Sequence, residues 1–224
     1  MLRLLLPRPA AGLRVLCLGA HSDDIELGCG GTVLQLLAEY PHTDFRWVVF
    51  SADQQRSEEA KASAAAFLAE AQSKQVCVLG YQDGFFPYVG GQIKSYFEGL
   101  KEFAPDLVLT HYRGDLHQDH RLICELTWNT FRDHLILEYE IPKYDGDLGA
   151  PNLFVELQEE ICRRKARYML DAFESQVNKH WFSEETFRAL LRIRGIESRA
   201  NSGYAEAFYC RKVVLGKNSV THPE

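Results

Sequence analysis

The chain has 224 residues, of which 46% are apolar and 25% are charged, and its formal net charge at pH 7 is −6. This composition is ordinary for a folded globular protein and excludes global disorder, while the acidic balance argues against non-specific nucleic-acid binding, which depends on basic patches. From this charge balance we expect no nucleic-acid partner. No apolar run approaches the roughly 18 residues that a membrane span needs, so we also expect no membrane span.

Short apolar runs alternate with amphipathic stretches along the chain. In order, they predict a strand over 13–19, a helix over 33–40, a strand over 45–51, a helix over 57–72, a strand over 76–79, a helix over 93–103, a strand over 107–110, a helix over 121–131 and a strand over 135–141. A turn-rich loop over 144–153 follows, then helices over 156–173 and 183–194 and a strand over 207–215. Such alternation is typical of an α/β fold, here a Rossmann-like, doubly wound, mostly parallel sheet with helices on both faces. No repeat or linker divides the chain, and we predict a single domain over 1–224.

The cysteines and the first residues indicate the compartment. The six cysteines include no CxxC pair and stand mostly in apolar stretches, so we expect reduced, buried thiols in a cytoplasmic protein. Residues 1–8 contain a short apolar run that Pro7 and Arg8 interrupt, and no small-residue cleavage pattern follows. We therefore expect an exposed leader to the first strand rather than a signal peptide.

The strongest local signal is the loop after the first predicted strand. It places His21, Asp23 and Asp24 at the carboxyl end of that strand, where open α/β sheets bind ligands. A nucleotide-binding fingerprint is the alternative, because glycines follow, but the two aspartates occupy the approach of the pyrophosphate and would repel it. The glycines are expected to form a tight turn that lets the next helix pack close to the sheet: Gly28, Gly30 and Gly31.

A second polar loop, residues 111–120, follows the fourth predicted strand. In the common doubly wound order the first and fourth strands are neighbours, so the two loops meet in one cleft. Desolvated carboxylates are costly without a partner, and a divalent cation is a natural one. Two imidazoles and one carboxylate with an open position for water suit catalytic zinc, although iron, manganese or cobalt fit the same ligands.

Three motifs together resemble the LmbE/PIG-L family of zinc-dependent N-deacetylases, which act on N-acetylated amino sugars and their conjugates. They are H-S-D-D at 21–24, G-C-G-G-T at 28–32 and H-Q-D-H at 117–120. The resemblance covers nearly the whole chain and includes the stretches 56–59, 81–84 and 203–208. Ser22 stands where the family usually has proline, which leaves the metal-binding positions intact.

The resemblance implies an LmbE-like fold and a role for each site residue. The zinc ligands, which would also hold Fe²⁺, would be His21, Asp24 and His120. Asp23 would be the general base for the attacking water, and His117 would stabilise the oxyanion or protonate the leaving amine. Asp119 would orient His117 and favour its charged form. Water would then hydrolyse an acetamide to acetate and a free amine.

The resemblance also implies substrate contacts from Arg56 and Asp83. For Arg56, a solvated side chain or a pair with Glu59 stays open. We expect a small N-acetylated sugar, free or linked to a nucleotide or a lipid, and loops over 81–91, 138–152 and 198–206 to shape its pocket. A homo-oligomer built on the C-terminal helices stays open as well.

Other polar and aromatic residues each allow two interpretations. Asp53 could face the cleft or cap a turn, and Asp115 could support the metal ligands or form a turn. His180 and Trp181 could stack on a sugar or pack ordinarily, and Glu206 could face the cleft or pair with Arg199. We interpret His111 as a hydrogen-bonded structural residue.

Two other functions compete with deacetylation. One is a non-catalytic sugar- or nucleotide-binding module on the same fold, which would have no need of both Asp23 and His117. The other is a metal-dependent hydrolase of another bond, such as an ester. A comparison of amide and ester substrates would separate the last alternative.

Overall fold

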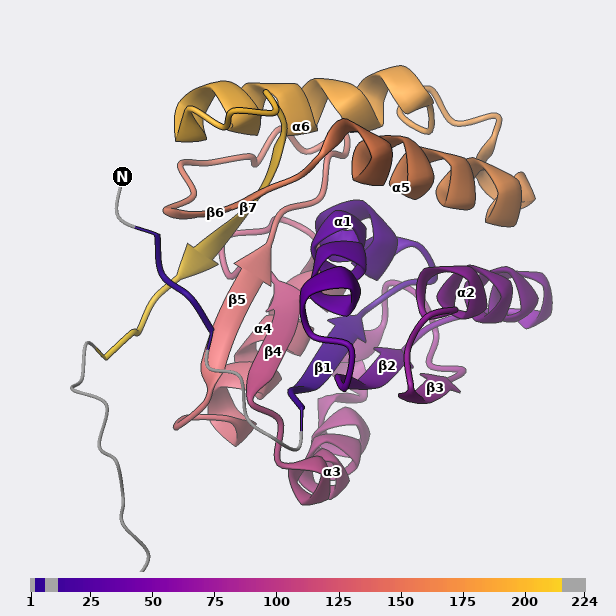
Figure 1. The fold of residues 1–224 in the computed structure, drawn as a ribbon. Helices are drawn as coiled ribbons and strands as arrows, with labels where there is room; N and C mark the ends of the chain where they lie inside the picture. The colour runs from indigo at the N-terminus through magenta and orange to yellow at the C-terminus, as the bar shows by residue number, and fades with distance from the viewer. Residues whose placement is uncertain (1–2, 7–11, 215–224) are drawn as a thin grey trace, which may run out of the picture.

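The computed structural model describes residues 3–6 and 12–214, which form one seven-stranded sheet between helical layers (Figure 1). The strands are β1 (Arg14–Gly19), β2 (Asp44–Val49), β3 (Ser73–Val78), β4 (Leu107–His111), β5 (Leu135–Tyr139), β6 (Leu153–Glu156) and β7 (Ala205–Cys210). Their order across the sheet is β3-β2-β1-β4-β5-β7-β6. Strands β1 to β5 pair in parallel, whereas β7 is antiparallel to both β5 and β6. The predicted Rossmann-like, mostly parallel sheet is confirmed, and β1 and β4 are neighbours as expected.

The helices cover both faces of this sheet. They are α1 (Asp24–Glu39), α2 (Gln54–Phe67), α3 (Gly90–Leu100), α4 (Gln118–Thr130), α5 (Glu159–Ala172) and α6 (Glu184–Ser198). Helices α1, α2 and α5 lie on one face, α3 and α4 on the other, and α6 packs beside α5 (Figure 1).

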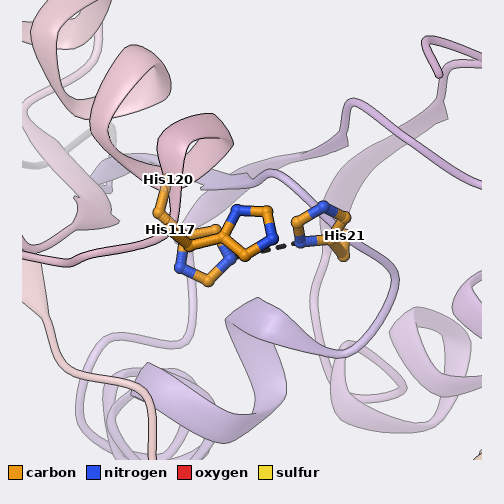
Figure 2. A group of neighbouring side chains, drawn as sticks. All are labelled: His21, His117 and His120. Atoms are coloured by element: carbon orange, nitrogen blue, oxygen red, sulfur yellow. Dashed lines mark hydrogen bonds between the residues drawn. The ribbon is translucent and has the colours of Figure 1, made fainter. Parts of the chain in front are cut away.

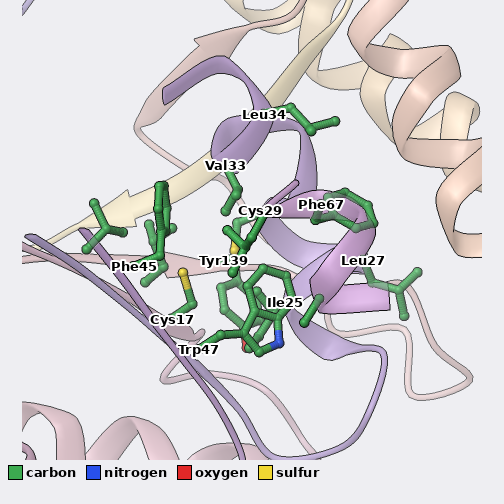
Figure 3. Close-up of a cluster of buried hydrophobic side chains, with 14 of the residues drawn as sticks. Cys17, Ile25, Leu27, Cys29, Val33, Leu34, Phe45, Trp47, Phe67 and Tyr139 are labelled. Carbon is green, nitrogen blue, oxygen red and sulfur yellow. The ribbon is translucent and has the colours of Figure 1, made fainter. Parts of the chain in front are cut away.

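The alternation of β1 side chains explains the two cores. Val15 and Cys17 point into the apolar cluster under α1 and α2, part of which Figure 3 shows, and Leu16 and Leu18 point into the cluster under α3 and α4. All four side chains are fully buried. A strand buried on both faces must be continuously apolar, which is why this run was readable from the sequence.

The start of α1 differs from the prediction. The helix begins at Asp24 rather than at 33, so the three glycines lie inside it and the expected tight turn is wrong. The expected close packing does hold, because a Cβ built on Gly28 would lie only 2.1 Å from the Tyr139 ring. Glycine runs lower helix propensity, and tertiary packing overrides that penalty here.

The C-terminal part contains a strand that the sequence did not indicate. Residues 153–156 pair with β7 at the edge of the sheet, and the following helix therefore begins at Glu159 rather than at 156. The strand predicted over 207–215 runs over Ala205–Cys210, and Leu215 lies outside the described residues. In the predicted leader, residues 3–5 are exposed, and Met1, Leu2, Pro7 and Arg8 lie outside the described residues.

Helix α1 is broken at Cys29, whose φ and ψ of −146° and 15° are not helical. In an unbroken helix the Gly31 N–H would bond to the Leu27 carbonyl. Instead, the Glu206 carboxylate accepts from the N–H groups of Gly31 (2.8 Å) and Thr32 (2.6 Å). The Lys165 ammonium donates to the Leu27 carbonyl and to Glu206, each at 2.7 Å. A buried ion pair from α5 and β7 thus replaces the hydrogen bonds that the break removes.

Two features bear on the expected environment of the protein. No helix among residues 3–6 and 12–214 has the length and apolar character needed to cross a bilayer. All six cysteines are free thiols, but two of them, Cys77 and Cys210, are partly exposed rather than buried.

Replacing Lys165 with methionine tests the ion pair at the break of α1. The variant keeps most of the side-chain volume but leaves the Glu206 carboxylate buried without its counter-charge. We expect the free energy of unfolding, measured by urea titration, to fall by about 3–5 kcal/mol. Arg163→Met on the same helix is the control, because its pair with Glu159 is exposed and should contribute at most about 1 kcal/mol. Equal losses in the two variants would contradict the assignment.

Candidate metal centre

The loops after β1 and β4 meet at the carboxyl edge of the sheet, each at the start of a helix. Asp23 is the N-cap of α1 and Asp24 its first residue, while His117 is the N-cap of α4. Figure 2 shows His21 facing His117 and His120 across this edge. The backbone N–H of His21 donates to Asp24 Oδ2 at 2.6 Å, which holds the first loop in a tight turn.

The donor atoms of the three predicted ligands lie close together, with a different Asp24 oxygen nearest to each histidine. His21 Nδ1 lies 3.2 Å from His120 Nε2 and 3.4 Å from Asp24 Oδ2. Asp24 Oδ1 lies 3.6 Å from His120 Nε2. Donors about 2.1 Å from a tetrahedral ion stand about 3.4 Å apart, so these separations suit zinc or a similar divalent cation.

The charges around His21 favour a cation at the same place. His21 Nε2 lies 2.9 Å from Asp83 Oδ1 and 3.5 Å from Asp119 Oδ2, and Asp24 is on its other side. Burial opposes a charge on His21, yet these carboxylates outweigh burial and raise its pKa well above the usual value. Burial also favours the neutral acid of Asp24, but His120 and His111 hold the pKa of Asp24 well below its usual value. The carboxylates around His21 therefore favour positive charge at this place, which a protonated His21 or a divalent ion would supply.

His120 is oriented by a carboxylate behind it. Its Nδ1–H donates to Asp115 Oδ2 at 2.9 Å, which leaves the Nε2 lone pair facing the candidate metal position. The Lys143 ammonium donates to the same Asp115 oxygen at 2.9 Å. Of the two interpretations of Asp115, this geometry fits support of a metal ligand. Lys143 was not singled out in the sequence, where it is one lysine just before the turn-rich loop over 144–153.

Two groups of neighbouring donor atoms include His120, one with His21 and His117 and one with Asp24 and His111. His111 belongs to the second group. It is fully buried and stacks on His120 with ring centres 3.9 Å apart. Its Nε2 lies 3.2 Å from Asp24 Oδ2, but it already accepts the Ala20 N–H at 2.9 Å. This hydrogen bond fits the structural interpretation of His111 and favours His21 over it as a ligand.

Asp23 lies beside the donor atoms and is paired with Arg56. Arg56 Nη2 donates to Asp23 Oδ1 at 2.8 Å, so neither a solvated Arg56 nor a pair with Glu59 is observed. Burial raises the pKa of Asp23, and the Arg56 guanidinium partly offsets that effect. Asp53 does both things that were considered for it, because it caps α2 through the Arg56 N–H and also lines the cleft.

The placement of Asp119 differs from the one implied by the family resemblance. Its carboxylate accepts from the backbone N–H groups of Gly84 (2.7 Å) and Phe86 (3.2 Å) rather than from His117. The contact between the two residues runs through the backbone, because the Asp119 N–H donates to His117 Nδ1 at 3.3 Å. Burial and the neighbouring His120 and His21 lower the pKa of His117, so the expected charged form is not favoured. The carboxylate of Asp119 fastens the loop that carries Asp83.

The donor atoms open into a cleft of about 610 Å³. Arg56 and Asp83 line it as implied, and so does the loop around Lys143, but residues 198–206 do not. Their place is taken by the segment between α5 and α6, which contributes Gln176, Lys179 and Trp181. In that segment the sequence analysis had singled out His180 and Trp181 as a pair that could stack on a sugar or pack ordinarily. His180 does not line this cleft, and Glu206 pairs with Lys165 rather than with Arg199.

The chain is similar to one family and to several solved structures. The sequence pattern of the GlcNAc-PI de-N-acetylase (PIG-L) family matches residues 16–131. The conserved protein TT1542 from Thermus thermophilus superposes with a TM-score of 0.73 at 21% identity, covering 92% of this chain and 98% of that one. N,N′-diacetylchitobiose deacetylase from Pyrococcus horikoshii gives 0.68 at 20% identity, with 88% and 83% covered. GalB, the 4-carboxy-2-hydroxymuconate hydratase from Pseudomonas putida, gives 0.68 at 16% identity, with 92% and 99% covered. These likenesses show the fold, and the fold alone does not select a reaction.

Replacing Asp119 with alanine tests its role as the anchor of the 84–86 loop. The variant leaves the N–H groups of Gly84 and Phe86 without their acceptor, and we expect the free energy of unfolding to fall by about 1–3 kcal/mol. Gln118→Ala is the control, since Gln118 is exposed and makes only a 3.4 Å contact to the Gly84 carbonyl. Unchanged stability of Asp119→Ala in a urea titration would refute the anchoring role.

Proposed function

The chain belongs to the GlcNAc-PI de-N-acetylase (PIG-L) family, and from that premise we propose that it is a zinc-dependent hydrolase that removes the acetyl group from an N-acetylated amino sugar or sugar conjugate. The observation that carries the proposal is the convergence of His21, Asp24 and His120 at separations of 3.2–3.6 Å, with Asp23 beside them in an open cleft. The Pyrococcus horikoshii neighbour, a deacetylase of a two-ring N-acetylated sugar by its name, supports the same substrate class. We further propose a single domain over 1–224 and a cytoplasmic location.

The ligand set would be His21, Asp24 and His120, and a zinc ion bound there would lower the pKa of water towards about 7 and polarise the acetamide carbonyl. Asp23 would take the proton of the attacking water, and its position in the lining of the cleft beside His21 and Asp24 supports this role. Arg56 holds Asp23 Oδ1, which fixes the carboxylate and leaves Oδ2 for the proton. Asp83 and Arg56 are placed to contact substrate hydroxyl groups.

His117 is placed to act on the developing oxyanion or the leaving amine. Because its Nδ1 accepts the Asp119 N–H, a neutral ring carries its proton on Nε2 and offers an N–H donor. That donor can stabilise negative charge on the acetamide oxygen. As the C–N bond breaks, Asp23 would return the proton it took from water to the leaving nitrogen, so that acetate and a free amine are released.

The competing functions differ in what they release. An ester hydrolase would release acetate from O-acetyl but not N-acetyl sugars, and a binding module would release nothing. The hydratase among the structural neighbours adds a third chemistry, water addition without bond cleavage. A panel of N-acetyl, O-acetyl and unsaturated carboxylate substrates separates these outcomes.

Metal content is the first measurement. We expect elemental analysis of the purified protein to find about one zinc per chain, and Asp24→Ala to lose it, because Asp24 faces both ligand histidines. Asp171→Ala, an exposed aspartate on α5, is the control and should retain the metal. Metal that is absent from the native protein, or is indifferent to Asp24, would overturn the hydrolase mechanism.

Replacing Asp23 with asparagine separates chemistry from metal binding. Asparagine keeps an oxygen for Arg56 but cannot take a proton, so acetate release should fall by about 10²–10⁴-fold while zinc content stays the same. Glu58→Gln, an exposed change on α2, should leave turnover unaltered. Normal turnover of Asp23→Asn would show that the base is a different group.

A further inference from the structure

Lys143 stands between the candidate metal centre and the loop that follows β5. Its ammonium donates to Asp115 Oδ2 at 2.9 Å and pairs with Asp147 Oδ2 at 2.5 Å. All three side chains are largely buried, with exposed fractions of 12% for Lys143, 2% for Asp115 and 6% for Asp147. Lys143 lies outside residues 16–131, which the family pattern matches, and it has no part in the chemistry proposed above.

The loop that carries Lys143 is held at both ends by α6. The Arg194 guanidinium donates to the two carboxylate oxygens of Glu140, each at 2.7 Å, and to the Gly149 carbonyl at 3.2 Å. Arg194 and Glu140 are both buried, so this contact is protected from solvent. The position of Lys143 is therefore set by a loop whose two ends are fastened to one helix.

The two carboxylates that Lys143 joins both hold the turn before α4. Asp147 Oδ2 accepts the Leu116 N–H at 2.7 Å, and Asp115 Oδ1 accepts the His117 N–H at 2.8 Å. Without a cation between them, two buried carboxylates this close to one ammonium position would repel each other. Lys143 thus keeps both acceptors in place on the segment that leads into the metal centre.

Lys143 and His120 share one oxygen of Asp115. His120 Nδ1–H donates to Asp115 Oδ2 at 2.9 Å, the same distance as that of the ammonium. A carboxylate that accepts from a metal-binding histidine makes the ring a stronger donor to the metal, and a cation on the same oxygen opposes that effect. Arg121 does not take this role, because its guanidinium donates to the backbone carbonyls of Asp115 and Leu116.

We propose that Lys143 is a positioning residue that acts on His120 through Asp115, so that the site holds a zinc ion less tightly and leaves it more electrophilic. The ammonium neutralises part of the Asp115 charge, and His120 then gives less electron density to a bound cation. A direct role of Lys143 in binding an anionic substrate fits less well, because its ammonium already contacts two carboxylates. The inference rests on the proposed function and names a residue that adjusts its metal centre.

The test measures zinc affinity, which needs no substrate. The full chain is stripped of metal, and the dissociation constant of zinc is determined by competition with a chelator. Lys143→Met removes the charge at similar volume, Lys143→Arg keeps the charge, and Asp115→Asn removes the carboxylate that supports His120. Lys179→Met is the matched control, because Lys179 lines the same cleft but lies against the Trp181 ring rather than against Asp115.

We expect Lys143→Met to bind zinc about threefold to tenfold more tightly, because a positive charge near the cation is lost. Asp115→Asn should bind zinc about 10–100-fold more weakly, since the histidine loses its support. Lys143→Arg and Lys179→Met should stay within about twofold of the native protein. Unchanged affinity of Lys143→Met would overturn the proposal. Weaker binding by both Lys143 variants would overturn it as well and leave the lysine with a structural role.

Turnover separates this inference from the proposed function. In zinc-loaded Lys143→Met, kcat for acetate release should fall by about threefold to tenfold while KM stays within about twofold, because the bound ion polarises the acetamide less. If the native protein releases no acetate, the deacetylase function fails, and the zinc affinities still decide the role of Lys143. If the native protein binds no zinc, the metal centre and this inference fail together.

Discussion

The ion pair between Lys165 and Glu206 holds a helix that would otherwise be incomplete. The break at Cys29 strips α1 of the Gly31-to-Leu27 hydrogen bond in a place where no water can replace it, since all three residues are buried. Glu206 supplies an acceptor to one side of the break and Lys165 supplies a donor to the other. Each charge in turn neutralises the other, so the pair satisfies the backbone without leaving an isolated buried ion. The N-terminal half of α1, which carries the candidate metal loop, is thereby fastened to α5 and β7 at the far end of the sequence.

A similar balance of charge governs the candidate metal centre. Asp23 and Asp24 stand at the N-terminus of α1, where unsatisfied N–H groups favour negative charge. Asp115 and Asp119 stand in the loop before α4 and in its first turn, and each accepts hydrogen bonds that position a neighbouring group. The permanently charged cations beside these carboxylates are Arg56, which pairs with Asp23, and Lys143, which pairs with Asp115. The side chain of His21 lies close to three further carboxylates, those of Asp24, Asp83 and Asp119. A site with this surplus of negative charge is suited to a cation. The electrostatics and the separations between donor atoms therefore both favour a divalent cation at the candidate metal position.

The two loops of the candidate metal centre, after β1 and after β4, could be found from the sequence because both depend on local and regular features. The apolar run of β1 is continuous, the polar residues begin where it ends, and the order of a doubly wound sheet brings β4 beside it. The break in α1 was not predictable, because it depends on a pair between Lys165, one charge in a helical stretch, and Glu206, for which the sequence suggested the cleft or Arg199. Strand β6 was missed because four residues at a sheet edge carry too little periodicity, and pairing with β7 is what defines them. The family resemblance implied that Asp119 orients His117, but the carboxylate of Asp119 accepts from the backbone N–H groups of Gly84 and Phe86, a contact between distant segments that the motif alone does not show.

The division of the molecule follows from these contacts. The stretch matched by the family pattern carries every proposed ligand, the proposed base Asp23 and His117, and the neighbouring strands β1 and β4 bring them together. The remainder closes the sheet with two antiparallel strands, secures α1 and adds one wall to the cleft. Glu59 ties that wall to the helix that also carries Arg56, because its carboxylate accepts from the N–H and the hydroxyl of Ser175, the residue before Gln176. Solved structures of this fold include a deacetylase and a hydratase at the same TM-score, so the fold leaves the reaction open and the side chains that line the cleft have to determine it.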